Sequence, residues 1–193
     1  LYDWANSAYA TIVLAGFFPI IYAEYFAASI DQSERTLYLG ISNSAASLLL
    51  IISAPLFGLL ADRFNKKKLF LSIFALVSIA STFMLSFISS NSFILASMLF
   101  SISLLGFMMS NVFYDAMLLE FENDKFNKIS SYGYAFGYLG GGTLFVINAF
   151  MVMNPSFFGF ENNVSAIKWS FVTVGVWWII FSHFRPVSTF RML

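Results

Sequence analysis

The sequence contains no cysteine and few charged residues. Only 10% of its 193 residues are Asp, Glu, Lys or Arg, whereas a soluble domain carries roughly 25%. The absence of cysteine excludes disulfides and thiol chemistry within the chain, but it identifies no compartment. Ten basic and ten acidic residues cancel, so the net charge gives no reason to expect a nucleic-acid partner. The chain starts at Leu1 without a basic leader, and we expect both ends to be truncated.

Hydrophobic residues make up 59% of the sequence, and they gather in long runs separated by short polar segments. A helix needs about 20 apolar residues to cross the hydrocarbon core of a membrane. Backbone amides at membrane depth need partners within their own segment, so these runs should be helices. We therefore predict an all-α membrane protein, a single six-helix bundle over residues 1–193. The predicted spans are residues 4–28, 37–61, 69–88, 93–119, 129–153 and 167–184.

The basic residues concentrate in alternate connections. The loops after the second and fourth spans and the tail after the sixth hold most of them, whereas the opposite side holds Arg35 and Lys168. Cytoplasmic loops carry an excess of Lys and Arg, so we predict that both ends lie in the cytoplasm. In a bacterium the membrane would be the plasma (inner) membrane. The cations of the basic side are Arg63, Lys66, Lys67, Lys68, Lys125, Lys128, Arg185 and Arg191.

A charged motif lies between the second and third predicted spans. Residues 58–70 read GLLADRFNKKKLF, which resembles the G-x-L-A-D-R-x-G-R-K-x-x-L signature of the major facilitator superfamily at the same position. Asn65 replaces the second glycine of that signature. Asn is the residue next best suited to a left-handed backbone, so we expect the turn to be kept. Lys66 and Lys67 replace Arg-Lys, which keeps the charge but loses the bidentate guanidinium.

Two further segments narrow the resemblance. YDWANSAYAT at residues 2–11 and SYGYAFGYLGGG at residues 131–142 are similar to the UMF branch of that superfamily, which includes fungal vacuolar amino-acid effluxers linked to autophagy. Members of the superfamily have twelve helices in two six-helix halves, each built as a 3+3 inverted repeat. The resemblance implies that this chain is the N-terminal half and that the C-terminal half is missing from it.

The resemblance also implies a gate at the charged motif. Asp62 is expected to face the positive end of a helix in the missing half. Arg63 and Lys66 are expected to pair with acids at the inner end of the fourth span, which would favour the outward-open state. For the cations, a topology signal near anionic headgroups is the alternative. The candidate gate residues are Gly58, Asp62, Arg63, Lys66, Lys67, Asp115 and Glu120.

Glycines recur every four residues in the fifth span, at Gly133, Gly137 and Gly141, with Gly140 beside them. Residues four apart share a helix face, and small residues let helix backbones approach closely in lipid. Two roles fit this pattern. The glycines form a smooth face on which the two halves rock, or they form static packing inside one bundle.

Polar residues of the first and fourth spans are the candidates for a solute cavity, because the superfamily lines its cavity with these helices. An ionisable group at mid-membrane is costly and is functional by default. By depth, however, Asp3, Glu24 and Asp115 lie near the membrane surfaces, where simple solvation or snorkelling is the alternative to a functional role. The functional candidates are a proton-coupling carboxylate at Glu24 and a gate ion pair at Asp115, whereas Asp3 is expected to serve as an anion at the start of the helix. Amides and hydroxyls suit a polar or zwitterionic solute. The candidates are Asn6, Tyr9, Glu24, Ser110, Asn111 and Tyr114.

Proline and tryptophan add two smaller expectations. Pro19 interrupts the first span, and the resulting kink borders a transport site or serves packing. Pro55 interrupts the second span, and its kink has the same two possible roles. Because the sixth helix is peripheral in the superfamily, Trp169, Trp177 and Trp178 are expected to face lipid. His183 is expected at the membrane interface.

The sequence shows no metal-ligand cluster, phosphate loop or nucleophile with a histidine base, so we predict no enzyme, no metal and no cofactor. We predict a secondary active transporter that moves a small polar solute by alternating access. Amino-acid efflux rests on the resemblance alone, and a proton is the default coupling ion. The expected partners are the solute, the lipid bilayer and the missing half. The alternative is a membrane-embedded interaction or assembly protein that has the fold but moves nothing.

Overall fold

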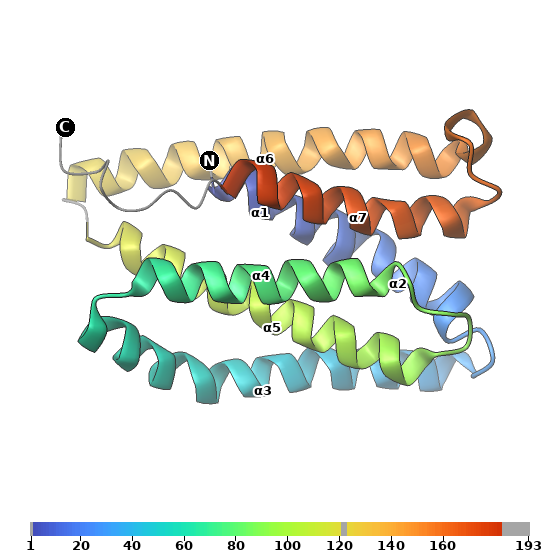
Figure 1. The fold of residues 1–193 in the computed structure, drawn as a ribbon, viewed down its shortest axis with the longest axis horizontal. Helices are drawn as coiled ribbons and strands as arrows, with labels where there is room; N and C mark the ends of the chain where they lie inside the picture. Colours follow the sequence, from blue (N-terminus) through green and yellow to red (C-terminus); the bar gives the residue numbers. More distant parts are fainter. Residues whose placement is uncertain (1, 121–122, 183–193) are drawn as a thin grey trace.

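The computed structural model describes residues 2–120 and 123–182, which form an all-α membrane protein (Figure 1). Among these residues, six helices are long and apolar enough to cross a membrane. The first alternates between α-helix and π-helix as α1 (Tyr2–Ala8), η1 (Tyr9–Phe17), α2 (Phe18–Ile21) and η2 (Tyr22–Phe26). The others are α3 (Gln32–Phe64), α4 (Lys67–Leu85), α5 (Phe93–Leu118), α6 (Asn123–Met153) and α7 (Asn163–Ser182), with the short 3-10 helix η3 (Pro155–Phe158) before α7.

Local capping sets both ends of α3. The helix begins at Gln32, ahead of the predicted residue 37, because the carboxylate of Asp31 accepts the backbone N–H of Glu34 at 2.8 Å. The same hydrogen bond lowers the pKa of Asp31 below its ordinary value. At the other end Asn65 has a φ of 53°, and the N–H of Lys66 donates to the carbonyl of Ala61 at 2.8 Å. The left-handed turn predicted at Asn65 is confirmed.

Arg35 closes the exposed end of the first helix. Its Nε donates to the carbonyl oxygens of Ala27 and Ile30 at 3.0 and 2.9 Å, and its Nη2 donates to that of Ala28 at 3.0 Å. The last carbonyls of a helix have no partner within the helix. A guanidinium with several donors satisfies them and fixes the short connection to α3.

The helices pack reciprocally, as a 3+3 repeat requires. The first helix of the first triplet packs against α6 and α7 of the second triplet. The first helix of the second triplet, α5, packs in turn against α3 and α4 of the first, and contact between α4 and α7 joins the two groups. Figure 1 shows α6 and α7 along one side and α3, α4 and α5 along the other. This arrangement is the six-helix half of a major-facilitator fold.

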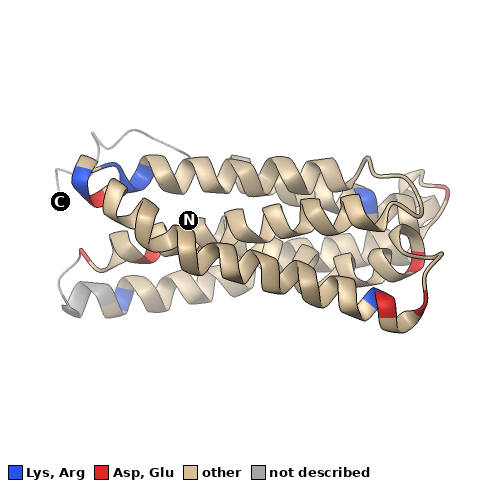
Figure 2. Ribbon diagram, turned by 90° about the horizontal axis from the view of Figure 1, so that it is seen from below, with Lys and Arg blue, Asp and Glu red and all other residues tan. Residues whose placement is uncertain are grey.

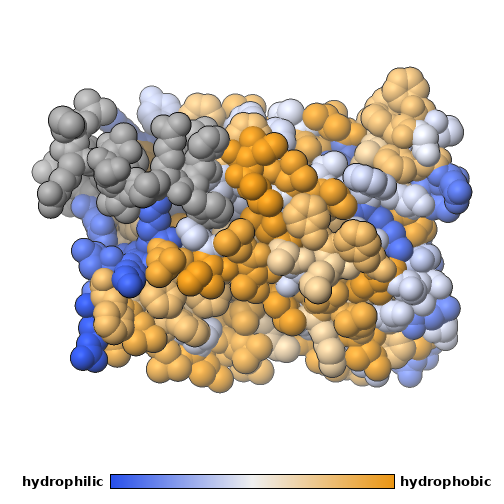
Figure 3. Space-filling view, in the orientation of Figure 1, coloured by the Kyte–Doolittle hydropathy of each residue, from blue (hydrophilic) through white to orange (hydrophobic). Residues whose placement is uncertain are grey.

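The outer surface is apolar between two polar ends. Figure 3 shows an orange band over the middle of the molecule and hydrophilic residues toward both ends. α3 contributes strongly to the band, since Leu48, Ile51 and Leu59 are 62%, 68% and 70% exposed. Lys, Arg, Asp and Glu gather at the two ends in Figure 2. Such an apolar band must be covered by lipid or by another protein surface.

Candidate functional site

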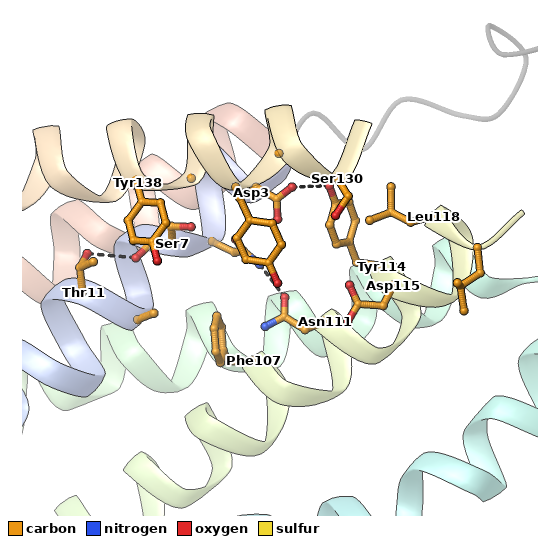
Figure 4. Close-up of a pocket in the computed structure, with 16 residues that line it drawn as sticks. Asp3, Ser7, Thr11, Phe107, Asn111, Tyr114, Asp115, Leu118, Ser130 and Tyr138 are labelled. Atoms are coloured by element: carbon orange, nitrogen blue, oxygen red, sulfur yellow. Dashed lines mark hydrogen bonds between the residues drawn. The ribbon is translucent and has the colours of Figure 1, made fainter. Parts of the chain in front are cut away.

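A cleft of about 540 Å³ lies between the first helix, α5 and α6 (Figure 4). Its lining combines two carboxylates, two amides and several hydroxyls, and each helix contributes residues spaced by four. Residues four apart share a helix face, so each helix turns one polar face toward the cleft. The polar lining residues are Asp3, Asn6, Ser7 and Thr11, then Asn111, Tyr114 and Asp115, then Ser130, Tyr134 and Tyr138.

The glycines of α6 bring that helix against the first one. A Cβ built at Gly140 would lie 2.5 Å from the carbonyl oxygen of Trp4, and one built at Gly141 would lie 2.9 Å from that of Ser7. A Cβ at Gly137 would lie 2.7 Å from the hydroxyl of Ser7, and one at Gly133 would overlap the carboxylate of Asp3. The four glycines therefore contact a helix of the same bundle. The static-packing role has structural support, and this face is not free to meet a second half.

An amide pair bridges the floor of the cleft. Asn6 Nδ2 donates to Asn111 Oδ1 at 2.6 Å, and Asn6 is only 5% exposed. A buried amide without a partner is costly in hydrocarbon, so the pair fixes the first helix against α5. The pair uses one of the four N–H donors of the two amides, and the amide N–H donors of Asn111 stay uncommitted to Asn6.

Two carboxylates give the cleft its charge. Asp3 accepts a hydrogen bond from the hydroxyl of Tyr114, and Asp115 lines the cleft one residue further along α5. Among the residues that the structure describes, no Lys or Arg lines this cleft. Simple solvation near a membrane surface was an alternative for Asp3 and Asp115. The structure brings both to one concave site, where they favour a cation or a hydrogen-bond donor.

Three predicted cavity residues lie elsewhere, which corrects the sequence interpretation. The ring of Tyr9 is fully buried against Phe107 and Trp178, with centroids 4.8 and 5.8 Å away. Ser110 is fully buried and donates to the carbonyl of its own helix at Phe107, 2.8 Å away. Glu24 belongs to η2, at the other end of the first helix, and does not line the cleft. Helical spacing alone could not place these residues, because it left the rotation of each helix open.

The charged motif after α3 forms an ion-pair network, but through a different cation than predicted. Lys67 Nζ lies 3.2 Å from a carboxylate oxygen of Asp62 and 2.8 Å from one of Glu120. Lys67 therefore takes the place predicted for Arg63 and Lys66, because it begins α4 and points across to the end of α5. Asp115, the other predicted acid, lines the cleft.

Other members of the motif have different surroundings. The guanidinium of Arg63 lies 6.0 Å from the ring centroid of Phe64. A Cβ at Gly58 would meet nothing within 4 Å, so the described helices do not explain that glycine.

Trp177 and Trp178 of α7 pack inside the bundle and do not face lipid as predicted, whereas Trp169 is 52% exposed. Trp178 is fully buried, and Trp177 donates its Nε1–H to the carbonyl of Trp4 at 3.1 Å. The rings of Trp4 and Trp177 stack at 5.8 Å. α7 thus supports the back of the first helix behind the cleft. His183, Arg185 and Arg191 lie outside the described residues, and so does the side chain of Lys125.

Sequence reasoning missed Ser7, Thr11, Ser130, Tyr134 and Tyr138 as lining residues. Their signal was present in the four-residue spacing 3-7-11 on the first helix and 130-134-138 on α6. The same spacing joins 107, 111 and 115 on α5. Three matching polar faces could have indicated a shared cleft.

The chain resembles known proteins over most of its length. Residues 30–188 match the family described as "Vacuole effluxer Atg22 like". A protein of Bacillus subtilis (strain 168), named as an uncharacterized MFS-type transporter, YxiO, is 35% identical over 94% of this chain and 43% of its own length. An uncharacterized protein of Aquifex aeolicus (strain VF5) is 29% identical over 80% of this chain and 38% of its own length.

The match covers only part of each relative. The chain spans less than half the length of either curated relative. No solved structure matches the chain. Six apolar helices in a reciprocal 3+3 arrangement agree with the transporter relative, and the family match covers most of the chain. The predicted resemblance is confirmed, and the chain belongs to the Atg22-like vacuole effluxer family of the major facilitator superfamily.

Proposed function

We propose that this chain is one half of a secondary active transporter that moves a small polar solute by alternating access. The observation that carries the proposal is the cleft, where three helices bring Asp3, Asn6, Asn111 and Asp115 to one site. Polar groups inside a membrane are costly and mark solute pathways. The relatives are more than twice as long as the matched region, so a second half supplies the opposing wall. The protein is then a carrier and not an enzyme.

The charge of the cleft favours a solute with an ammonium group. Two carboxylates attract a cation, and the rings of Tyr134 and Tyr138 offer aromatic faces beside them. Asn111 and Thr11 add polar contacts for the rest of the solute. An amino acid fits these groups when the second half supplies a partner for its carboxylate. The family name supports efflux as the direction of transport. A proton on one of the two carboxylates is the proposed coupling ion.

The ion-pair network of Lys67 is proposed as the inner gate. It ties the start of α4 to the end of α5 through Glu120 and to the end of α3 through Asp62. These ends lie on the basic side of the chain, which the positive-inside rule assigns to the cytoplasm together with both ends of the chain. In a bacterial host the membrane is the plasma membrane.

A flux assay tests the proposal. The full-length protein is reconstituted in proteoliposomes, and uptake of each amino acid is measured in the presence and absence of a proton gradient. Wild type should move at least one of them. Asp3→Asn and Asp115→Asn should reduce that flux, whereas Glu24→Gln, a matched carboxylate outside the cleft, should leave it near wild type.

Two outcomes would count against the proposal. No movement of any amino acid or other small polar solute would favour the alternative, a membrane-embedded assembly protein. Equal loss of flux in Asp115→Asn and Glu24→Gln would reject the cleft as the solute site while keeping transport.

A further inference from the structure

The first helix is π-helical beside the cleft. At the end of η1 the N–H of Phe18 donates to the carbonyl of Val13, five residues back. The N–H of Ala27 likewise donates to Tyr22 at 2.8 Å. π-helices are rare and mostly appear as single turns, frequently at functional sites. The π segment η1 is 9 residues long and directly follows the turn that carries Asn6 and Ser7.

Gly16 permits this π register. A Cβ built there would lie 2.8 Å from the carbonyl oxygen of Thr11, five residues earlier on the same helix. Alanine has a higher α-helix propensity than glycine, so an alanine at this position would favour the α form over the π form. Pro19 adds a second cause, because it lacks an N–H and its ring crowds the carbonyl four residues back, at Ala15.

The outer flank of the π segment is held in place. The ring of Phe18 stacks on Phe100 with centroids 3.9 Å apart. The carbonyl of Tyr25 accepts the N–H of Asn91 at 3.0 Å, and Arg35 holds the last carbonyls of the helix. The other flank, α1, borders the open cleft. A change of register within η1 that leaves the outer flank in place turns α1 and breaks the hydrogen bond between Asn6 and Asn111.

We propose that Gly16 is a positioning residue for the cleft, because it holds the first helix in the π register that turns Ser7 toward α6. An α-helix advances about 100° per residue, so each π turn that reverts to α rotates α1 by about that angle. The following residue then takes the place of each cleft residue. Ser7 leaves the cleft, and Ala8, which is fully buried in the structure, enters it. The positioning role rests on the proposed function, whereas the helical register can be measured without any transport activity.

Thiol labelling of the full-length protein reads this register. Ser7→Cys and Ala8→Cys are introduced separately into a cysteine-free form, and each is reacted with a membrane-impermeant maleimide. With Gly16 present, Ser7→Cys should react faster than Ala8→Cys. Gly16→Ala should lower the ratio of the two rates, because the new Cβ crowds the carbonyl of Thr11 in the π register and alanine favours the α-helix. Gly142→Ala is the matched control, because a Cβ there meets nothing within 4 Å, and it should leave the ratio unchanged.

Pro19→Ala provides an independent variant, since it restores a backbone donor and should lower the same ratio. An unchanged ratio in folded Gly16→Ala protein would overturn the proposal. If Gly16→Ala does not fold, the ratio in Pro19→Ala decides. If neither variant folds, the π geometry is needed to build the helix and the positioning role is rejected. A lowered ratio in a protein that moves no solute would support the register and refute transport, so the two failures are distinguishable.

Discussion

Gly140→Ala should destabilise the protein through one identifiable contact. The new Cβ would lie 2.5 Å from the carbonyl oxygen of Trp4 and 2.8 and 2.9 Å from two atoms of its ring. A backbone oxygen cannot rotate away as a flexible side chain can, so α6 and α1 must move apart. That movement also loosens the stacking of Trp4 on Trp177.

The magnitude follows from comparison with Gly142→Ala on the same helix. Both variants gain the same helix propensity, roughly 1 kcal/mol, and Gly142 has open space for a Cβ. Propensity therefore cancels in the difference between them. What remains is the cost of overpacking, about 1–3 kcal/mol. Gly140→Ala should be less stable than Gly142→Ala by that amount.

Unfolding in mixed micelles with increasing SDS, followed by tryptophan fluorescence, measures this difference. The comparison is made in the full-length protein at one lipid-to-detergent ratio. Equal unfolding midpoints for the two variants, or a higher midpoint for Gly140→Ala, would refute the close approach of α6 to the first helix.

Three further predictions concern other contacts. In a double-mutant cycle, Asn6→Ala and Asn111→Ala should show a coupling free energy of about 0.6 kcal/mol and no more than about 1.7 kcal/mol, which is the range for hydrogen bonds between membrane helices. If the effects of the two substitutions on stability are independent, the two amides do not pair. Arg35→Met should lower the free energy of unfolding by about 1 kcal/mol or more, because carbonyls at the end of the first helix lose their donor, while Arg63→Met should change it less. Asp62→Asn and Lys67→Gln should each change the free energy of unfolding by less than about 1 kcal/mol, because the ion pairs are exposed. Both should slow the conformational cycle more than they weaken the affinity for solute. Normal cycling with a loss of affinity would contradict the role of these residues as a gate.

The fold could be predicted from the sequence because lipid imposes it. Long apolar runs with polar breaks must be helices, and three separate motifs pointed to one superfamily. Helix ends were less predictable, since they depend on local caps. The carboxylate of Asp31 starts α3 inside a segment that looked like a polar loop. The π-helical form of the first helix gave no periodic signal, although Pro19 lies just after the end of η1.

The site was only partly predictable, because the rotation of each helix is a property of packing. Asn6, Asn111 and Tyr114 line the cleft, whereas Tyr9 and Ser110 turn into the core next to them. Which cation bridges Asp62 and Glu120 also depended on where α4 begins. Charge alone could not separate Lys67 from Arg63 or Lys66, since all three belong to the same short motif.

The polar cleft between the first helix, α5 and α6 should be open to water within the membrane. Labelling of two single cysteines on α5 by a membrane-impermeant maleimide tests it most directly. Asn111→Cys lies in the cleft, and Ile102→Cys replaces a side chain that is 46% exposed on the apolar surface. In proteoliposomes, Asn111→Cys should react readily and Ile102→Cys should stay unlabelled. Equal reaction at both positions, or none at Asn111→Cys from either side of the membrane, would contradict the account.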